Sequence, residues 1–223
     1  MDRVDILHFS DILCVWAYVE QVRMDELAAS FGDRVRVSAH FVQVFGDART
    51  KLTRGWSERG GQAGYAAHVR EICERLGVGP IHPACWARTL PASSLACHLW
   101  LRAIGVAEAD GELEAGALER AARALRTAFF QQGLDVSQAG ELRRITDECG
   151  LERAAIEAAL ETGTAHAALD RDLELARTHD VRMSPTLVFN EGRQRLAGNV
   201  GYRMLAANVR ELLEHGAGGA SWC

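Results

Sequence analysis

The order of strand and helix patterns at the start of the chain constrains its fold most. Residues 4–9 form a short apolar run typical of a buried strand, which ends at Ser10-Asp11, a pair that favours a helix start. A helical pattern follows and closes at Gly32-Asp33. Residues 35–41 then alternate between apolar and polar, which predicts a half-buried strand. Because such crossovers are right-handed, we expect the two strands to lie parallel in one sheet.

The middle of the chain is predicted to be helical. Apolar residues recur at helical spacing from Leu118 to Phe129 and in shorter segments from Leu142 to Ala158. The stretches 46–64 and 77–92 are rich in glycine or proline, so both are predicted to be loops. No strand pattern interrupts this region, which indicates an all-helical insertion.

Strand patterns return near the end of the chain. Residues 186–189 and 193–197 are predicted to form a hairpin, followed by a closing amphipathic helix. The fold class is therefore α/β, with strands at both ends of the chain and helices between them. We expect one domain to comprise residues 1–60 and 168–215, a helical lid to comprise 61–167, and 216–223 to form a flexible tail.

Composition narrows the range of partners. The formal net charge is −5, without blocks of lysine and arginine, so we expect no nucleic-acid partner. The N-terminus lacks a basic segment followed by an apolar one, and no apolar run approaches about 18–20 residues. We therefore expect a cytoplasmic protein without a membrane partner. Whether it forms a homodimer stays open.

Cysteine spacing limits the chemistry further. The six cysteines are widely spread and include no Cys-x-x-Cys pair, so neither a zinc ribbon nor a small disulfide scaffold fits. His82 and Cys85 lack a second pair of ligands, and we expect no metal site. Cys85, in a loop beside Pro83, is the candidate for an exposed thiol, whereas Cys73, Cys97 and Cys149 are expected to be packed.

Two motifs make the chain resemble the DsbA family of the thioredoxin superfamily. Leu13-Cys14-Val15-Trp16-Ala17-Tyr18 stands where that family opens its first helix with a Cys-x-Trp-Cys type motif, and Met183-Ser184-Pro185-Thr186 resembles its cis-proline loop. Gly198-Asn199 and the helix from Tyr202 also match. The resemblance covers most of the chain and extends to kappa-class glutathione transferases and 2-hydroxychromene-2-carboxylate isomerases. It implies a thioredoxin fold with a helical insertion.

Cys14 is the candidate catalytic residue. At the first turn of a helix its sulfur would face unpaired backbone N–H groups and the positive end of the helix dipole. We therefore predict that its pKa lies below the usual value of about 8.5. The resemblance implies that Ser184-Pro185 is a cis peptide close to this sulfur, and that Trp16, Ala17, Ser184 and Pro185 line the substrate site.

Ala17 decides which thiol chemistry is available. It stands where a dithiol oxidoreductase has its second cysteine, so Cys14 has no partner within the motif. Glutathione or another low-molecular-weight thiol is one candidate for the second thiol, and no tightly bound cofactor is expected. Cys223 is the other candidate, because the spacer 216–220 is small and flexible.

The function expected from these features is thiol–disulfide exchange at Cys14, on low-molecular-weight or protein thiols. One alternative is a glutathione-dependent isomerase or transferase, in which the activated sulfur belongs to glutathione; such enzymes usually carry serine where Cys14 stands. Another is a redox-inactive binding protein, in which Ala17 marks a lost function.

Overall fold

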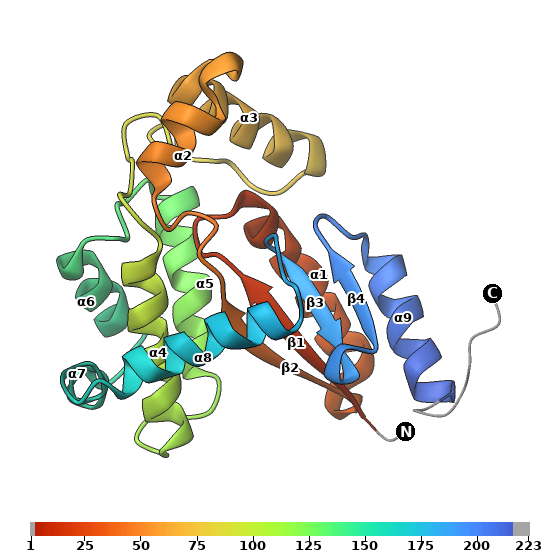
Figure 1. Ribbon diagram of the computed structural model, residues 1–223. Coiled ribbons are helices and arrows are strands. Elements are labelled where there is room, and N and C mark those ends of the chain that lie inside the picture. The colour runs from red at the N-terminus through yellow and green to blue at the C-terminus, as the bar shows by residue number, and fades with distance from the viewer. Residues whose placement is uncertain (1–2, 216–223) are drawn as a thin grey trace.

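The computed structural model describes residues 3–215 and contains one mixed sheet with helices around it (Figure 1). In chain order the elements are β1 (Val4–Ser10), α1 (Val15–Phe31), η1 (Gly32–Arg34), β2 (Val35–Phe41), α2 (Ala48–Gly55), η2 (Ser57–Arg59), α3 (Gly61–Leu76), α4 (Leu95–Ala109), α5 (Ala117–Phe130), α6 (Ala139–Glu148), α7 (Arg153–Glu161), α8 (Thr164–Thr178), β3 (Thr186–Phe189), η3 (Asn190–Gly192), β4 (Gln194–Ala197) and α9 (Tyr202–His215). The tail assigned to 216–223 lies outside the described residues.

The sheet confirms the predicted strands at both ends of the sequence. Its order is β2-β1-β3-β4, with β1 and β2 parallel and the other pairs antiparallel. Ile6 pairs with Val37 in the parallel ladder and with Phe189 in the antiparallel one. The apolar run of β1 therefore lies in the interior of the sheet, which explains why it does not alternate with polar residues.

Helices cover both faces of the sheet. Val4 and Ile6 of β1 share a buried cluster with Leu27 of α1 and Leu205 of α9 on one face. Phe9 packs with Ala176 of α8 on the other. Figure 1 shows α8 crossing in front of the sheet and α1 behind it, with α4 to α7 at one side. This arrangement places the start of α1 at the end of β1, beneath α2 and α3.

The stretch 46–64 was wrongly predicted to be a loop. It contains α2, whose first turn is capped by the Asp47 side chain accepting from the Thr50 backbone N–H at 2.9 Å. Gly64 lies in the first turn of α3, where a Cβ would lie 1.8 Å from the carbonyl oxygen of Arg59. A glycine is therefore required at position 64 because the helix packs closely there, and not because the chain forms a loop.

Candidate functional site

Cys14 lies at the junction of strand and helix that the sequence predicts. It is the residue before the first turn of α1, where the backbone N–H groups of Trp16 and Ala17 favour its thiolate form and so lower its pKa. The Cys14 Sγ donates to the carbonyl oxygen of Ser184 at 3.3 Å. The Ser184–Pro185 peptide bond is cis. Two segments 170 residues apart in sequence thus meet at one sulfur atom.

The prediction of a low thiol pKa is wrong for this structure. The Cys14 side chain is only 5% exposed, and this burial raises its pKa above the usual value. The helix amides and the Ser184 hydroxyl favour the thiolate, while the nearby Asp11 carboxylate opposes it. The rise in pKa caused by burial is larger than the fall caused by the helix amides, so Cys14 is mainly a thiol at neutral pH.

Asp11 is a structural centre of the site that sequence reasoning did not identify. It is fully buried, and its carboxylate accepts from the backbone N–H of Phe45 and the hydroxyl of Ser94, both at 2.8 Å. It also accepts from the Leu13 backbone N–H at 2.9 Å. Asp11 therefore ties the Cys14 segment to the loop after β2 and to the start of α4. The sequence identified Ser10-Asp11 as a pair that favours a helix start, but it did not predict that Asp11 bonds to Phe45 and Ser94.

Ser184 contacts the same segment through its side chain. Its hydroxyl accepts from the Asp11 backbone N–H at 2.9 Å, which leaves its own proton available to the Cys14 sulfur. Pro185 follows, and its carbonyl oxygen accepts from Gly198 N–H at 2.8 Å. These two bonds hold the loop before β3 against the end of β1 and the end of β4.

The remaining motif residues flank Cys14. Ala17 is fully buried, and Trp16 is partly buried against the main apolar cluster. The cysteines within the described residues are all free, and Cys85 is 1% exposed, so the expectation of an exposed thiol there is wrong. Its neighbour Trp86 packs against Phe45 and Phe129, and this aromatic packing buries the loop. Cys223 lies outside the described residues.

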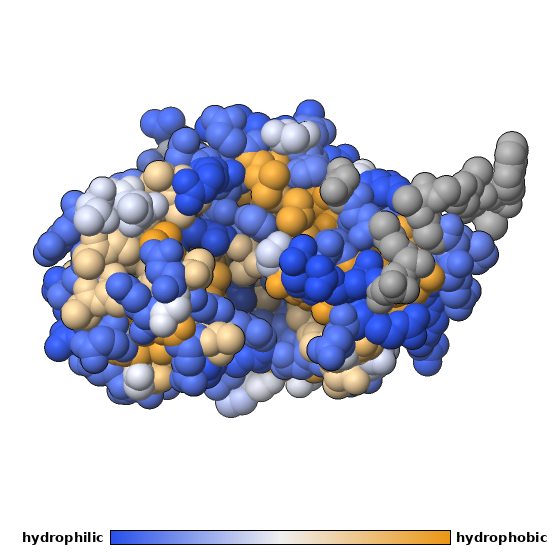
Figure 2. Space-filling view, turned by 90° about the horizontal axis from the view of Figure 1, so that it is seen from below, coloured by the Kyte–Doolittle hydropathy of each residue, from blue (hydrophilic) through white to orange (hydrophobic). Residues whose placement is uncertain are grey.

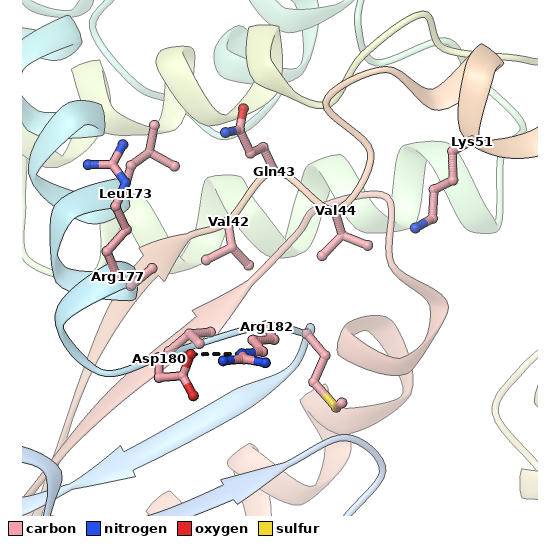
Figure 3. Close-up of a pocket in the computed structure, with 11 residues that line it drawn as sticks. Val42, Gln43, Val44, Lys51, Leu173, Arg177, Asp180 and Arg182 are labelled. Atoms are coloured by element: carbon pink, nitrogen blue, oxygen red, sulfur yellow. Dashed lines mark hydrogen bonds and ion pairs between the residues drawn. The ribbon is translucent and has the colours of Figure 1, made fainter. Parts of the chain in front are cut away.

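A groove of about 500 Å³ opens beside the Ser184 loop (Figure 3). Met183 lines it together with Val42 and Val44 from the segment after β2. Charged side chains surround this apolar floor: Lys51, Arg177, Asp180 and Arg182. Arg182 is ion-paired with Asp180, and Arg177 with Glu174, so Lys51 is the cation of this groove with no ion pair among the described residues. The groove can therefore receive a carboxylate at Lys51, next to the segment that contacts Cys14.

The described residues contain no group of three or more His, Cys, Asp or Glu side chains that could hold a metal ion. None of their helices is long and apolar enough to cross a membrane.

The family follows from comparison of the whole chain with known proteins. The model of the DSBA-like thioredoxin domain matches residues 5–210. The chain belongs to the DSBA-like thioredoxin family. The sheet order and the helical insertion agree with this membership, so the predicted thioredoxin fold is confirmed.

Solved structures show the same DsbA-like fold at low identity. A probable DsbA oxidoreductase from Streptomyces coelicolor is 18% identical, with a TM-score of 0.73 over 95% of this chain and 90% of that one. A putative protein disulfide isomerase from Nitrosomonas europaea is 12% identical, with a TM-score of 0.74 over 96% and 99%. The cytosolic disulfide reductase DsbM from Pseudomonas aeruginosa, solved with GSH, is 18% identical, with a TM-score of 0.66 over 92% and 99%. No curated protein matches the sequence.

Proposed function

We propose that this DsbA-like protein is a thiol–disulfide oxidoreductase with Cys14 as its single motif thiol. The observation that carries the proposal is the contact between the Cys14 sulfur and Ser184, at a helix start whose amides favour the thiolate. Ala17 provides no second thiol, so an external thiol completes the exchange. Glutathione or a protein thiol fills this role, and no tightly bound cofactor is involved.

The exchange is balanced in two steps. The Cys14 thiolate attacks the glutathione sulfur of a mixed disulfide RS–SG and forms a Cys14–glutathione disulfide, while the RS–SG bond breaks and RS⁻ leaves and takes up a proton. The thiolate of a second glutathione then attacks the sulfur of the bound glutathione, which releases oxidised glutathione and restores the Cys14 thiolate. The net reaction converts RS–SG and one glutathione thiol into RSH and one glutathione disulfide.

Ser184 has two roles in this scheme. In the free protein its carbonyl oxygen accepts the Cys14 thiol proton. When that proton leaves, the carbonyl becomes free to accept an N–H of an extended substrate. Lys51 lines the adjoining groove and would attract a carboxylate of glutathione or of an acidic peptide, whereas Arg177 and Arg182 are ion-paired with Glu174 and Asp180.

We place this activity in the cytoplasm. The DsbM protein, which shares the fold, is described as a cytosolic disulfide reductase. A reducing compartment keeps dispersed cysteines as thiols and supplies the second thiol that Ala17 cannot provide.

The test combines adduct mapping with turnover. Purified full-length protein is exposed to oxidised glutathione, and each cysteine is mapped by mass spectrometry. We expect a glutathione adduct on Cys14 that reduced glutathione removes. Cys14→Ser should abolish turnover of a glutathionylated peptide, while Cys149→Ser keeps it, because Cys149 lies away from the site at the end of α6. An adduct confined to other cysteines, or full turnover by Cys14→Ser, would overturn the proposal.

Cys223 is the second candidate for the resolving thiol. Diamide oxidation followed by non-reducing peptide mapping distinguishes it from glutathione. A Cys14–Cys223 linked peptide that disappears when residues 216–223 are removed would support the internal thiol. Stable glutathionylation of Cys14 with Cys223 still reduced would exclude it.

A glutathione-dependent isomerase is the second candidate function. A 2-hydroxychromene-2-carboxylate isomerase structure shares the fold, with a TM-score of 0.64 at 17% identity. The burial that keeps Cys14 protonated also suits a group that donates a hydrogen bond to the sulfur of bound glutathione. In that case Cys14→Ser should retain isomerase activity, because a serine hydroxyl is a stronger hydrogen-bond donor than a thiol.

A further inference from the structure

A second cavity lies on the α1 side of the sheet, apart from the groove beside Ser184. Its volume is about 580 Å³, and residues from β1, β2, α1, α4 and α5 line it. Figure 2, which views the molecule from below, shows a hollow near the middle of the surface on that underside. None of the residues that line this cavity also lines the groove at Met183. The cavity is therefore a separate site of a size that suits a small organic ligand.

Arg126 of α5 is the charged group that distinguishes this cavity. The residue is 6% exposed, and its guanidinium donates to Ser10 Oγ at 2.8 Å and to Gln21 Oε1 at 3.1 Å. Both partners are neutral. The buried Arg126 Nε has no hydrogen-bond partner among the described residues. Burial lowers the pKa of Arg126 to about 10, so it remains a cation at neutral pH.

The other arginines of the cavity are already neutralised. Arg102 is ion-paired with Asp172, and Arg123 is ion-paired with Asp25 and Glu119. The carboxylate of Glu108 is also occupied, because it accepts from the backbone N–H groups of Gly116 and Leu118.

The groups facing Arg126 leave it without a direct carboxylate partner. Buried Glu20 and Asp11 both attract Arg126 electrostatically, but neither bonds to it directly. The hydrogen bond of Glu20 goes to His8 at 2.9 Å, and the Asp11 carboxylate accepts from Leu13, Phe45 and Ser94. His40, on the β2 edge, bonds to Asp172 at 2.8 Å. An anion that reaches Arg126 would therefore meet a buried cation that no carboxylate of the described residues pairs with directly.

The walls leading to Arg126 are largely apolar. Met24 of α1, Val35 and Val37 of β2, and Leu118 and Ala122 of α5 line the cavity. Val37 is 41% exposed, which is unusual for a β-branched residue on a strand and indicates an apolar surface that a ligand could cover. The cavity thus combines a buried cation with an apolar approach.

We propose that this cavity binds a small organic carboxylate whose apolar body lies between β2 and α5 and whose carboxylate pairs with Arg126. The ligand class follows from the two halves of the site: the cation selects an anion, and the walls select a hydrocarbon or aromatic body.

The test measures binding of 2-naphthoate to the full-length protein by isothermal titration calorimetry. The matched neutral probe is 2-naphthamide, which has the same ring system without the charge. We expect one saturable site for 2-naphthoate, and at least about tenfold weaker binding of the amide, because the neutral amide cannot pair with the guanidinium charge.

Two variants locate the site, each with a control on the same helix. Arg126→Met removes the charge, and Ala28→Trp fills the mouth of the cavity from the exposed face of α1. Each should weaken binding of 2-naphthoate at least about tenfold. The controls are Arg120→Met and Ala29→Trp, which are exposed and do not line the cavity, and they should bind like the wild type.

The outcomes decide the proposal even if Arg126→Met does not fold, because Ala28→Trp leaves the buried groups intact. Absence of saturable binding by the wild type, equal affinity for the amide, or undiminished binding by Ala28→Trp would each overturn it. Circular dichroism of every variant verifies that a loss of binding is not a loss of fold.

Discussion

The Cys14 thiol donates to the carbonyl oxygen of Ser184 across 3.3 Å, in a site where the sulfur is almost removed from water. This bond exists only for the protonated thiol. It couples the reactivity of Cys14 to the loop that lies beside the proposed substrate groove, because ionisation of the sulfur frees the Ser184 carbonyl for another donor.

Alkylation of Cys14 is expected to rise with pH without levelling off near neutrality. Burial raises the thiol pKa in the fold, and the thiolate is the reactive form. Iodoacetamide labelling between pH 6 and 10, resolved by peptide mass, measures the profile for Cys14 itself. A rate that reaches its plateau below pH 8 would contradict the burial argument.

Folding stability should fall at alkaline pH partly through the same group. A thiol whose pKa is raised in the fold contributes stability below its unfolded pKa of about 8.5, and loses that contribution as the pH rises through the folded value. Urea unfolding from pH 7 to 10 should show a smaller alkaline loss in Cys14→Ser than in the wild type. Equal losses in both proteins would show that Cys14 does not contribute.

Asp11→Asn should lower the pKa of Cys14 and destabilise the protein. The carboxylate charge raises the thiol pKa, so its removal shifts the alkylation profile to lower pH. One carboxylate oxygen of Asp11 accepts from the Phe45 N–H and the Ser94 hydroxyl, and the other accepts from the Leu13 N–H. Asparagine has an NH₂ group in place of one of these oxygens, and this group cannot accept the bonds of the oxygen it replaces. We expect a loss of about 1–3 kcal/mol in unfolding free energy. Asp33→Asn, on the exposed turn after α1, is the control and should change neither measurement.

Asp172→Ala should strongly destabilise the edge of the sheet. Asp172 of α8 accepts from the Phe41 backbone N–H at 2.9 Å and also bonds to His40 and Arg102. The Arg102 guanidinium in turn donates to the Ala39 carbonyl oxygen of β2. Removing the carboxylate leaves a largely buried arginine unpaired, which costs about 3–5 kcal/mol. Urea unfolding measures the loss. Asp170→Ala, exposed on the same helix, should lie within about 0.5 kcal/mol of the wild type.

Gly64→Ala should destabilise α3 despite the higher helix propensity of alanine. The added Cβ would lie 1.8 Å from the Arg59 carbonyl oxygen, so η2 or the first turn of α3 must move. We expect a cost of about 1–3 kcal/mol in thermal or urea unfolding. Gly55→Ala, at the end of α2, meets no atom within 4 Å and should be neutral or slightly stabilising. A neutral result at Gly64 would show that the turn yields easily.

Local patterns were sufficient for the elements of the thioredoxin-like half. The apolar run at 4–9 and the alternation at 35–41 predicted a parallel pair that the structure contains, because strand periodicity records which side chains face the core. The prediction of a loop at 46–64 was wrong, because it took glycine as a sign of a loop. Gly64 is required by close packing within a helix, and a sequence pattern does not distinguish such a glycine from one in a loop.

The sequence by itself determined which chemistry is available at the site: one cysteine at a strand–helix junction, an alanine in place of a second thiol, and a Ser-Pro loop. The tertiary structure decided how that chemistry behaves. Burial of Cys14 reverses the sign of the pKa shift that the helix start predicts, and Asp11 acts on residues 34 and 83 positions away. The unused donor on Arg126 likewise exists only once α5 packs beside β1. Solvent exclusion and electrostatic contacts depend on what surrounds a group in space, and helical and strand periodicity carry no record of it.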